Sequence, residues 1–142
     1  MEKPFFIISK GQVVINWFLT IVLGSFLEPV FSIFILPSGE SFSEFHFGMV
    51  LLNFIVGLIA SLPSCFLLLM VSVLLNSKQF VLDAYWTKQN LLHAVIAIVS
   101  FLILGFVFHF ATFSIAVGFT TAGFLIWNTF FILEARKQNL NK

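Results

Sequence analysis

Four long apolar runs, separated by short polar segments, restrict the fold of this chain more than any other feature. The runs cover about residues 13–36, 47–75, 91–108 and 112–133. A helix of about 20 apolar residues crosses the hydrocarbon core of a bilayer, and each run is close to that length or longer. A mean hydropathy of +1.09 and a charged fraction of only 9% are also far from the values of soluble proteins. The sequence therefore predicts an all-α integral membrane protein, a single domain over residues 1–142 that folds as an antiparallel four-transmembrane-helix bundle.

The positions of the positive charges predict how this bundle is oriented. Lys and Arg occur only in the N-terminal tail, in the loop at residues 76–89 and in the C-terminal tail, whereas the loops at residues 37–46 and 109–111 contain none. Short loops rich in Lys and Arg stay in the cytoplasm. The pattern therefore predicts an even number of spans, a tight hairpin at residues 109–111 and cytoplasmic N and C termini. A bacterial inner membrane is the simplest location for so small a chain.

The loop at residues 76–89 also carries large apolar and aromatic side chains between its two lysines. Trp and Tyr favour the interface between membrane and water. We therefore expect Phe80, Leu82, Tyr85 and Trp86 to lie on the cytoplasmic surface of the membrane.

Glu28 is the only formally charged residue inside the four apolar runs. Ionisable side chains at that depth are costly, so they usually face protein or water rather than lipid. Pro29 follows directly and is expected to kink the first helix. Steps of three or four residues define one helix face, which we predict to point inward. Besides Glu28, this face holds Trp17, Thr20, Gly24, Ser25 and Ser32.

A matching stripe of small and polar residues runs along the second apolar run. It consists of Asn53, Gly57, Ala60, Ser61, Ser64 and Ser72, and small residues let two helices approach closely. Glu28 precedes the first loop by about as many residues as Asn53 follows it, so antiparallel helices would hold both at similar depth. We predict a hydrogen bond between the Glu28 carboxyl and the Asn53 amide, with the carboxyl in its neutral form because a charge in lipid is costly. Ser25, Ser32 and Thr121 complete this group of candidate residues for binding a proton, an ion or a ligand.

The third and fourth runs carry further polar residues on faces that can pack closely. The fourth run has one stripe of Ser114, Gly118, Thr121 and Asn128, and a neighbouring stripe of Ala116, Thr120 and Gly123. By depth, His93 of the third run faces Asn128 near the cytoplasmic side. We predict that these two residues form a polar pair with a mainly structural role.

No feature of the sequence requires catalysis. The chain has no Gly-rich phosphate loop, no nucleophile elbow and no Cys or His cluster with the spacing of metal ligands. Cys65 is the single cysteine, and the net charge of +1 gives no nucleic-acid footprint. We therefore expect no enzymatic activity, no cofactor, no metal site and no nucleic-acid partner.

Two functions fit the remaining features. Four short helices enclose little core and present small-residue faces, which favours a non-enzymatic membrane subunit that binds copies of itself or another membrane protein in the lipid bilayer. The alternative is a small proton- or cation-linked transporter or channel that uses the carboxyl of Glu28. The length, the four spans and the acid in the first span resemble the small multidrug resistance transporters. Those proteins have a weak charge bias, whereas all 7 cations of this chain lie on one side, so we do not assign it to that family.

Overall fold

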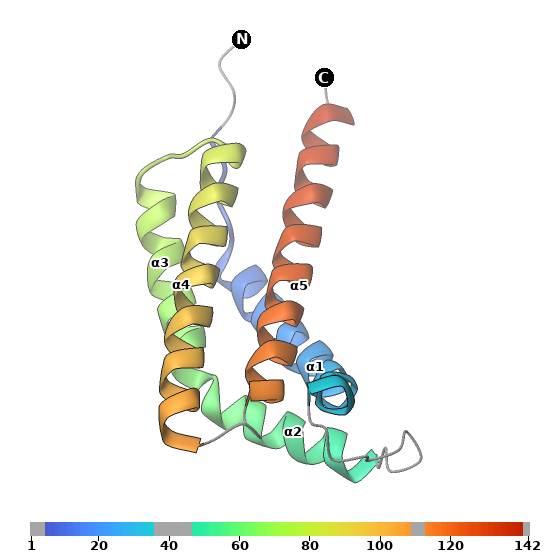
Figure 1. The fold of residues 1–142 in the computed structure, drawn as a ribbon. Coiled ribbons are helices and arrows are strands. Elements are labelled where there is room, and N and C mark those ends of the chain that lie inside the picture. Colours follow the sequence, from blue (N-terminus) through green and yellow to red (C-terminus); the bar gives the residue numbers. More distant parts are fainter. Residues whose placement is uncertain (1–4, 36–46, 109–112, 141–142) are drawn as a thin grey trace.

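Helices make up nearly all of the described structure (Figure 1). The computed structural model describes residues 5–35, 47–108 and 113–140. The helices are α1 (Lys10–Ile35), α2 (Phe47–Ala60), α3 (Leu62–Ser77), α4 (Leu82–Phe108) and α5 (Phe113–Leu140). The predicted all-α class is confirmed for these residues. The predicted loop at 37–46 and the predicted hairpin turn at 109–111 lie outside them.

Two of the described helices are long and apolar enough to cross a membrane. The two segments are Lys10–Phe31 in α1 and Ile115–Gln138 in α5. A third candidate is the bent pair Val50–Ala60 and Leu62–Ser77, if these two helices form one broken span. The lengths and compositions of these segments are compatible with an integral membrane protein.

The second predicted span is not one continuous helix, because the chain bends by 51° between α2 and α3. Pro63 lies in the first turn of α3, where it lacks a backbone N–H and its ring would clash with the carbonyl one turn earlier in a straight helix. Backbone hydrogen bonds continue on both sides of the bend, from Ser61 N to Gly57 O and from Cys65 N to Ser61 O, each 3.0 Å long. The prediction of a single helix over residues 47–75 was therefore wrong, because two helices joined by a bend cover these residues.

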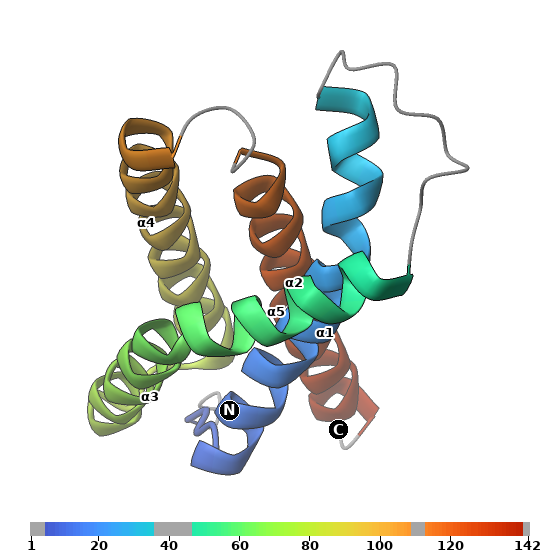
Figure 2. The same ribbon diagram turned by 90° about the horizontal axis from the view of Figure 1, so that it is seen from below.

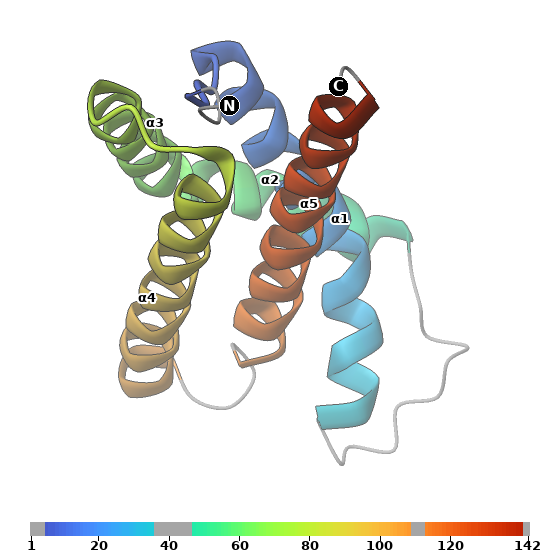
Figure 3. The same cartoon turned by 90° about the horizontal axis from the view of Figure 1, so that it is seen from above.

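Pro29 acts differently, since α1 remains one helix on both sides of it. The ribbon of α1 changes direction along its second half, as Figures 2 and 3 show from opposite ends. This change is in the region where a proline was expected to kink the helix.

Along the chain, α1, α3, α4 and α5 run in alternating directions, and α2 lies across them. Helices α4 and α5 contact each other in opposite directions, and α1 packs along α5 (Figures 1 and 3). Helix α2 crosses over the middle of α1 (Figure 2). The connection between α3 and α4 lies toward the same end of the molecule as the last turns of α5 (Figure 1). Cationic residues of these two regions, among them Lys78 and Lys137, are therefore gathered toward one end.

The segment before α1 is fixed against the connection between α3 and α4. The Phe6 amide donates to the Phe80 carbonyl at 2.9 Å. The Asn76 side chain bonds both backbone groups of Ile8, at 3.2 Å to its N–H and 2.9 Å to its carbonyl. The Phe6 ring packs edge-on against Tyr85, with the ring centroids 5.1 Å apart.

Two side chains in the segment at residues 80–86 are buried within the protein. Leu82 is 5% exposed and Tyr85 is fully buried, in a cluster with Phe6 and with Phe131 near the end of α5. The N-terminal segment and α5 cover these two side chains, and the location of the segment on the membrane surface stays a prediction.

Replacing Tyr85 with phenylalanine is expected to stabilise the protein by about 1 kcal/mol. The buried Tyr85 hydroxyl has no hydrogen-bond partner among the described residues, and a buried polar group left in that state is costly. Burial also raises the pKa of this hydroxyl above its ordinary value of 10.0. The unfolded chain therefore loses the phenolic proton first, so the stability of the wild type should fall further above about pH 10 than that of the variant.

Thermal unfolding in detergent, followed by circular dichroism from about pH 8 to about pH 11, measures both effects. Tyr85 is the only tyrosine of the chain, so the difference between wild type and Tyr85→Phe measures the effect of this one phenol. Identical stability curves at every pH would contradict the prediction.

Candidate functional site

The buried carboxyl of Glu28 binds the side chain of Asn53, as the sequence predicted. Glu28 is 6% exposed, and the Asn53 amide nitrogen donates to Glu28 Oε2 at 2.5 Å. The bond joins α1 to α2, the two helices whose antiparallel pairing was used to predict it. This hydrogen bond gives a partner to the buried carboxyl and to the amide, as buried polar groups require.

A glycine of α5 positions the backbone of α1 at Glu28. A Cβ atom built on Gly118 would lie only 2.9 Å from both the Cα and the backbone nitrogen of Glu28. Only glycine therefore allows the two backbones to approach so closely here, as small residues do between membrane helices. Gly118 thus fixes the helix that carries the carboxyl.

The ring of Phe119 lies between a glycine of α1 and a glycine of α2. A Cβ atom on Gly24 would lie 2.5 Å from Phe119 Cδ1, and one on Gly57 would lie 2.7 Å from Phe119 Cζ. Gly24 is one helical turn before Glu28, and Gly57 is one turn after Asn53. The Phe119 ring therefore lies about one helical turn from the carboxyl–amide pair along both α1 and α2.

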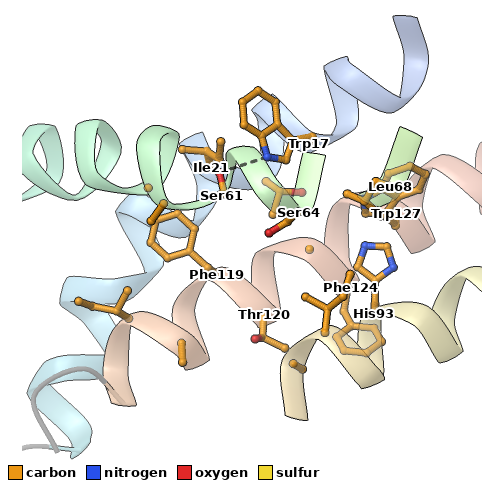
Figure 4. Close-up of a pocket in the computed structure, with 18 of the residues that line it drawn as sticks. Trp17, Ile21, Ser61, Ser64, Leu68, His93, Phe119, Thr120, Phe124 and Trp127 are labelled. Carbon is orange, nitrogen blue, oxygen red and sulfur yellow. Dashed lines mark hydrogen bonds between the residues drawn. The ribbon is translucent and has the colours of Figure 1, made fainter. Parts of the chain in front are cut away.

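A cavity of about 350 Å³ lies on the other side of this ring, between all the described helices. Figure 4 shows Trp17, Ser61, Phe119, Thr120 and His93 around it. The predicted inward stripes of the first two apolar runs supply much of one wall, namely Trp17, Thr20, Asn53, Gly57, Ala60, Ser61 and Ser64. Helices α4 and α5 add His93 and Ala97, and Ala116, Thr120 and Gly123. Asn53 thus contacts Glu28 and also borders the cavity.

The cavity has a polar bridge on one wall and a group of rings on another. The Trp17 indole N–H donates to Ser61 Oγ at 3.1 Å (Figure 4), at the bend between α2 and α3. The ring of His93 lies 5.3 Å from that of Trp127 and 6.0 Å from that of Phe124, measured between centroids. The space between the helices is therefore bordered mainly by apolar and aromatic groups.

The predicted pair of His93 and Asn128 is replaced by different partners. The Asn128 amide exchanges hydrogen bonds with Asn90, at 3.1 and 3.2 Å, and accepts one from the Trp86 indole at 2.7 Å. The His93 ring bonds the Gln89 carbonyl instead. Predicting the pair from depth alone was wrong by about one helical turn, because Asn90 and not His93 lies opposite Asn128.

The remaining predicted site residues have other surroundings where the structure describes their side chains. The Ser25 hydroxyl is buried but donates to the Ile21 carbonyl of its own helix at 2.7 Å. Ser32 lies in α1, and its side chain is outside the described part of the structure. Helix α5 presents Thr120 rather than Thr121 to the cavity.

The sequence analysis did not identify Phe119 or Trp127 as site residues. A signal for Phe119 was present, because Gly24 and Gly57 lie at matching depth on two helices that were expected to pair. Two facing glycines leave room for one large side chain from a third helix. No comparable signal marked Trp127.

The geometry defines a helical protein with a buried carboxyl–amide pair beside a partly open cavity between the helices. Within the described residues, no three His, Cys, Asp or Glu side chains are grouped as metal ligands would be. The expectation that the protein has no metal and no cofactor stays a prediction. Comparison with known proteins finds no matching family model, curated protein or solved structure.

Proposed function

We propose that this chain is a small multi-pass membrane protein in which the Glu28 carboxyl binds a proton or a small cation, as part of a transporter or channel. The position of Asn53 carries this proposal, because its side chain contacts Glu28 and also borders the cavity. A proton or cation in the cavity would be one side chain away from the buried carboxyl.

The proposed topology has four spans, in which α2 and α3 together form one broken span. Non-helical backbone at membrane depth is tolerated where it borders a cavity, and Ser61 at the bend does so. The gathering of Lys78 and Lys137 toward one end of the molecule supports cytoplasmic termini through the positive-inside rule. A bacterial inner membrane is the proposed location.

Replacing Glu28 with glutamine tests the ion site. Glutamine keeps the size and hydrogen-bonding capacity of the side chain but cannot release a proton or carry a negative charge. In reconstituted vesicles, we expect the wild type to conduct protons or alkali cations and Glu28→Gln to fall to the level of protein-free vesicles. A pH-sensitive dye and cation-loaded vesicles measure the two fluxes.

Glu134→Gln is the matched control, since Glu134 is paired with Lys137 near the end of α5, away from the cavity. We expect this variant to keep the flux of the wild type. Equal flux in wild type and Glu28→Gln, or no flux by the wild type above protein-free vesicles, would refute the proposal.

A non-enzymatic membrane subunit is the second candidate function. It is favoured by a series of exposed apolar side chains on α2 and α3, which includes Ile55, Ile59, Leu62 and Phe66. Such a surface fits lipid or the helices of another membrane protein or a second copy. Light scattering in mild detergent should then give a mass above the 16.0 kDa of one chain, after correction for bound detergent, whereas a monomer without a co-purifying protein would contradict this candidate.

A further inference from the structure

Three hydrogen-bond donors that border the cavity are engaged within the protein. The Trp17 indole donates to Ser61, and the Asn53 amide donates to Glu28. The Thr20 hydroxyl donates to the Asn16 carbonyl at 2.8 Å. A ligand that needs a donor from one of these three groups would therefore have to compete with an existing bond.

The ring of His93 provides a hydrogen-bond acceptor rather than a donor. Its Nδ1 lies 2.9 Å from the Gln89 carbonyl oxygen, and a carbonyl can only accept, so Nδ1 carries the hydrogen. In the neutral ring Nε2 is then an acceptor, and it lies on the ring edge away from Gln89. The ring borders the cavity between Trp127 and Phe124 (Figure 4).

The size and the lining of the cavity suit a small organic molecule rather than one water molecule. A volume of about 350 Å³ lies within the range of small-molecule sites, which are lined mainly by apolar and aromatic side chains with a few polar groups that fix orientation. A liquid water molecule takes up about 30 Å³, and a site bordered mainly by apolar groups holds water poorly. Away from Asn53, which contacts the Glu28 carboxyl, these walls give a charged ligand body no compensation for its lost hydration.

We propose that the cavity is a binding site for an uncharged, mostly apolar molecule with a single O–H or N–H group, such as a phenol. The aromatic rings of Trp127 and Phe124 contact its apolar body, and its donor group bonds His93 Nε2. The proposal does not depend on ion binding by Glu28, since neither contact involves that carboxyl.

The direct test compares two probes that differ at one oxygen, which carries a hydrogen in one and a methyl group in the other. 4-Bromophenol has a hydroxyl, whereas 4-bromoanisole carries a methyl ether in its place, and bromine quenches tryptophan fluorescence at short range. Trp17 and Trp127 border the cavity and report on binding in protein reconstituted into lipid nanodiscs. We expect saturable quenching by 4-bromophenol and roughly tenfold weaker binding of 4-bromoanisole, the size of one net hydrogen bond.

Two variants distinguish binding of the probe in the cavity from its partition into the surrounding lipid. Ala97→Leu fills part of the cavity and should abolish the saturable quenching, while His93→Phe keeps a ring but lacks the acceptor and should bind both probes equally weakly. The comparison of the two probes on the wild type needs no variant, so the test holds even if His93→Phe fails to fold. Equal affinity for both probes would indicate a purely apolar site, such as one for a lipid chain, and would overturn the proposal. Quenching that is not saturable, or that is unchanged in Ala97→Leu, would also overturn it.

Discussion

Replacing Gly118 with alanine is expected to destabilise the folded protein by roughly 1–3 kcal/mol, the usual cost of an added methyl group in a packed interior. The new Cβ would lie 2.9 Å from the Cα and backbone nitrogen of Glu28. A flexible side chain could move away from such a contact, but a helix backbone cannot do so without shifting α1. We expect a lower midpoint of thermal unfolding in detergent, followed by circular dichroism.

Gly123→Ala is the matched control on the same helix. Its Cβ would make only ordinary contacts, at 3.5 Å to Thr20 Cγ2 and 3.6 Å to His93 Cδ2. Because alanine favours the helix over glycine by about 1 kcal/mol, this variant should be as stable as the wild type or more stable. A Gly118→Ala protein as stable as Gly123→Ala would show that α1 and α5 are not in close backbone contact.

The contact between Glu28 and Asn53 could be predicted from the sequence because two simple constraints fix it. The two residues are at similar distances from the loop that joins their helices, which places them at a similar depth, and they meet where α2 crosses α1. Each lies on a stripe of small and polar residues, so the rotation of each helix was also determined. Depth and rotation together leave few other partners for a buried carboxyl.

The partner of Asn128 could not be predicted in the same way, because the helices extend beyond the apolar runs. Helix α4 begins at Leu82 and α5 ends at Leu140, outside the predicted spans at 91–108 and 112–133. An error of one turn in the helix register is enough to exchange Asn90 for His93. Polar residues continue a helix as easily as apolar ones, so hydropathy alone does not determine these ends.

The cavity also lies beyond what the sequence determines. The stripes that border it, including Thr20, Ser64 and Thr120, were identified as faces for close packing. Whether such faces touch or leave a space depends on the angles between helices, and the bend at Pro63 changes that angle for α3. Pro29 stands beside a buried carboxyl and was expected to kink its helix, whereas the bend at Pro63 was not predicted.

A double-mutant cycle at Phe119 is the second prediction with a large expected effect. Gly57→Ala would bring a Cβ to 2.7 Å from the Phe119 ring, which cannot retreat because Gly24 of α1 lies against it. We expect this change to cost roughly 1–3 kcal/mol.

In a Phe119→Leu background the same Gly57→Ala change should cost less than about 1 kcal/mol, since the smaller side chain leaves room for the methyl group. The difference between the two costs is the coupling energy, which for residues in direct contact is about 0.5–3 kcal/mol. Thermal unfolding of the four proteins in one detergent measures it. Gly48→Ala serves as the control on α2, because a Cβ at Gly48 meets no atom within 4 Å and should change the stability by the same amount in both backgrounds. If Gly57→Ala costs the same with phenylalanine and with leucine at position 119, the ring does not lie between the two glycines. The carboxyl–amide pair would then not be bordered by Phe119 on its cavity side.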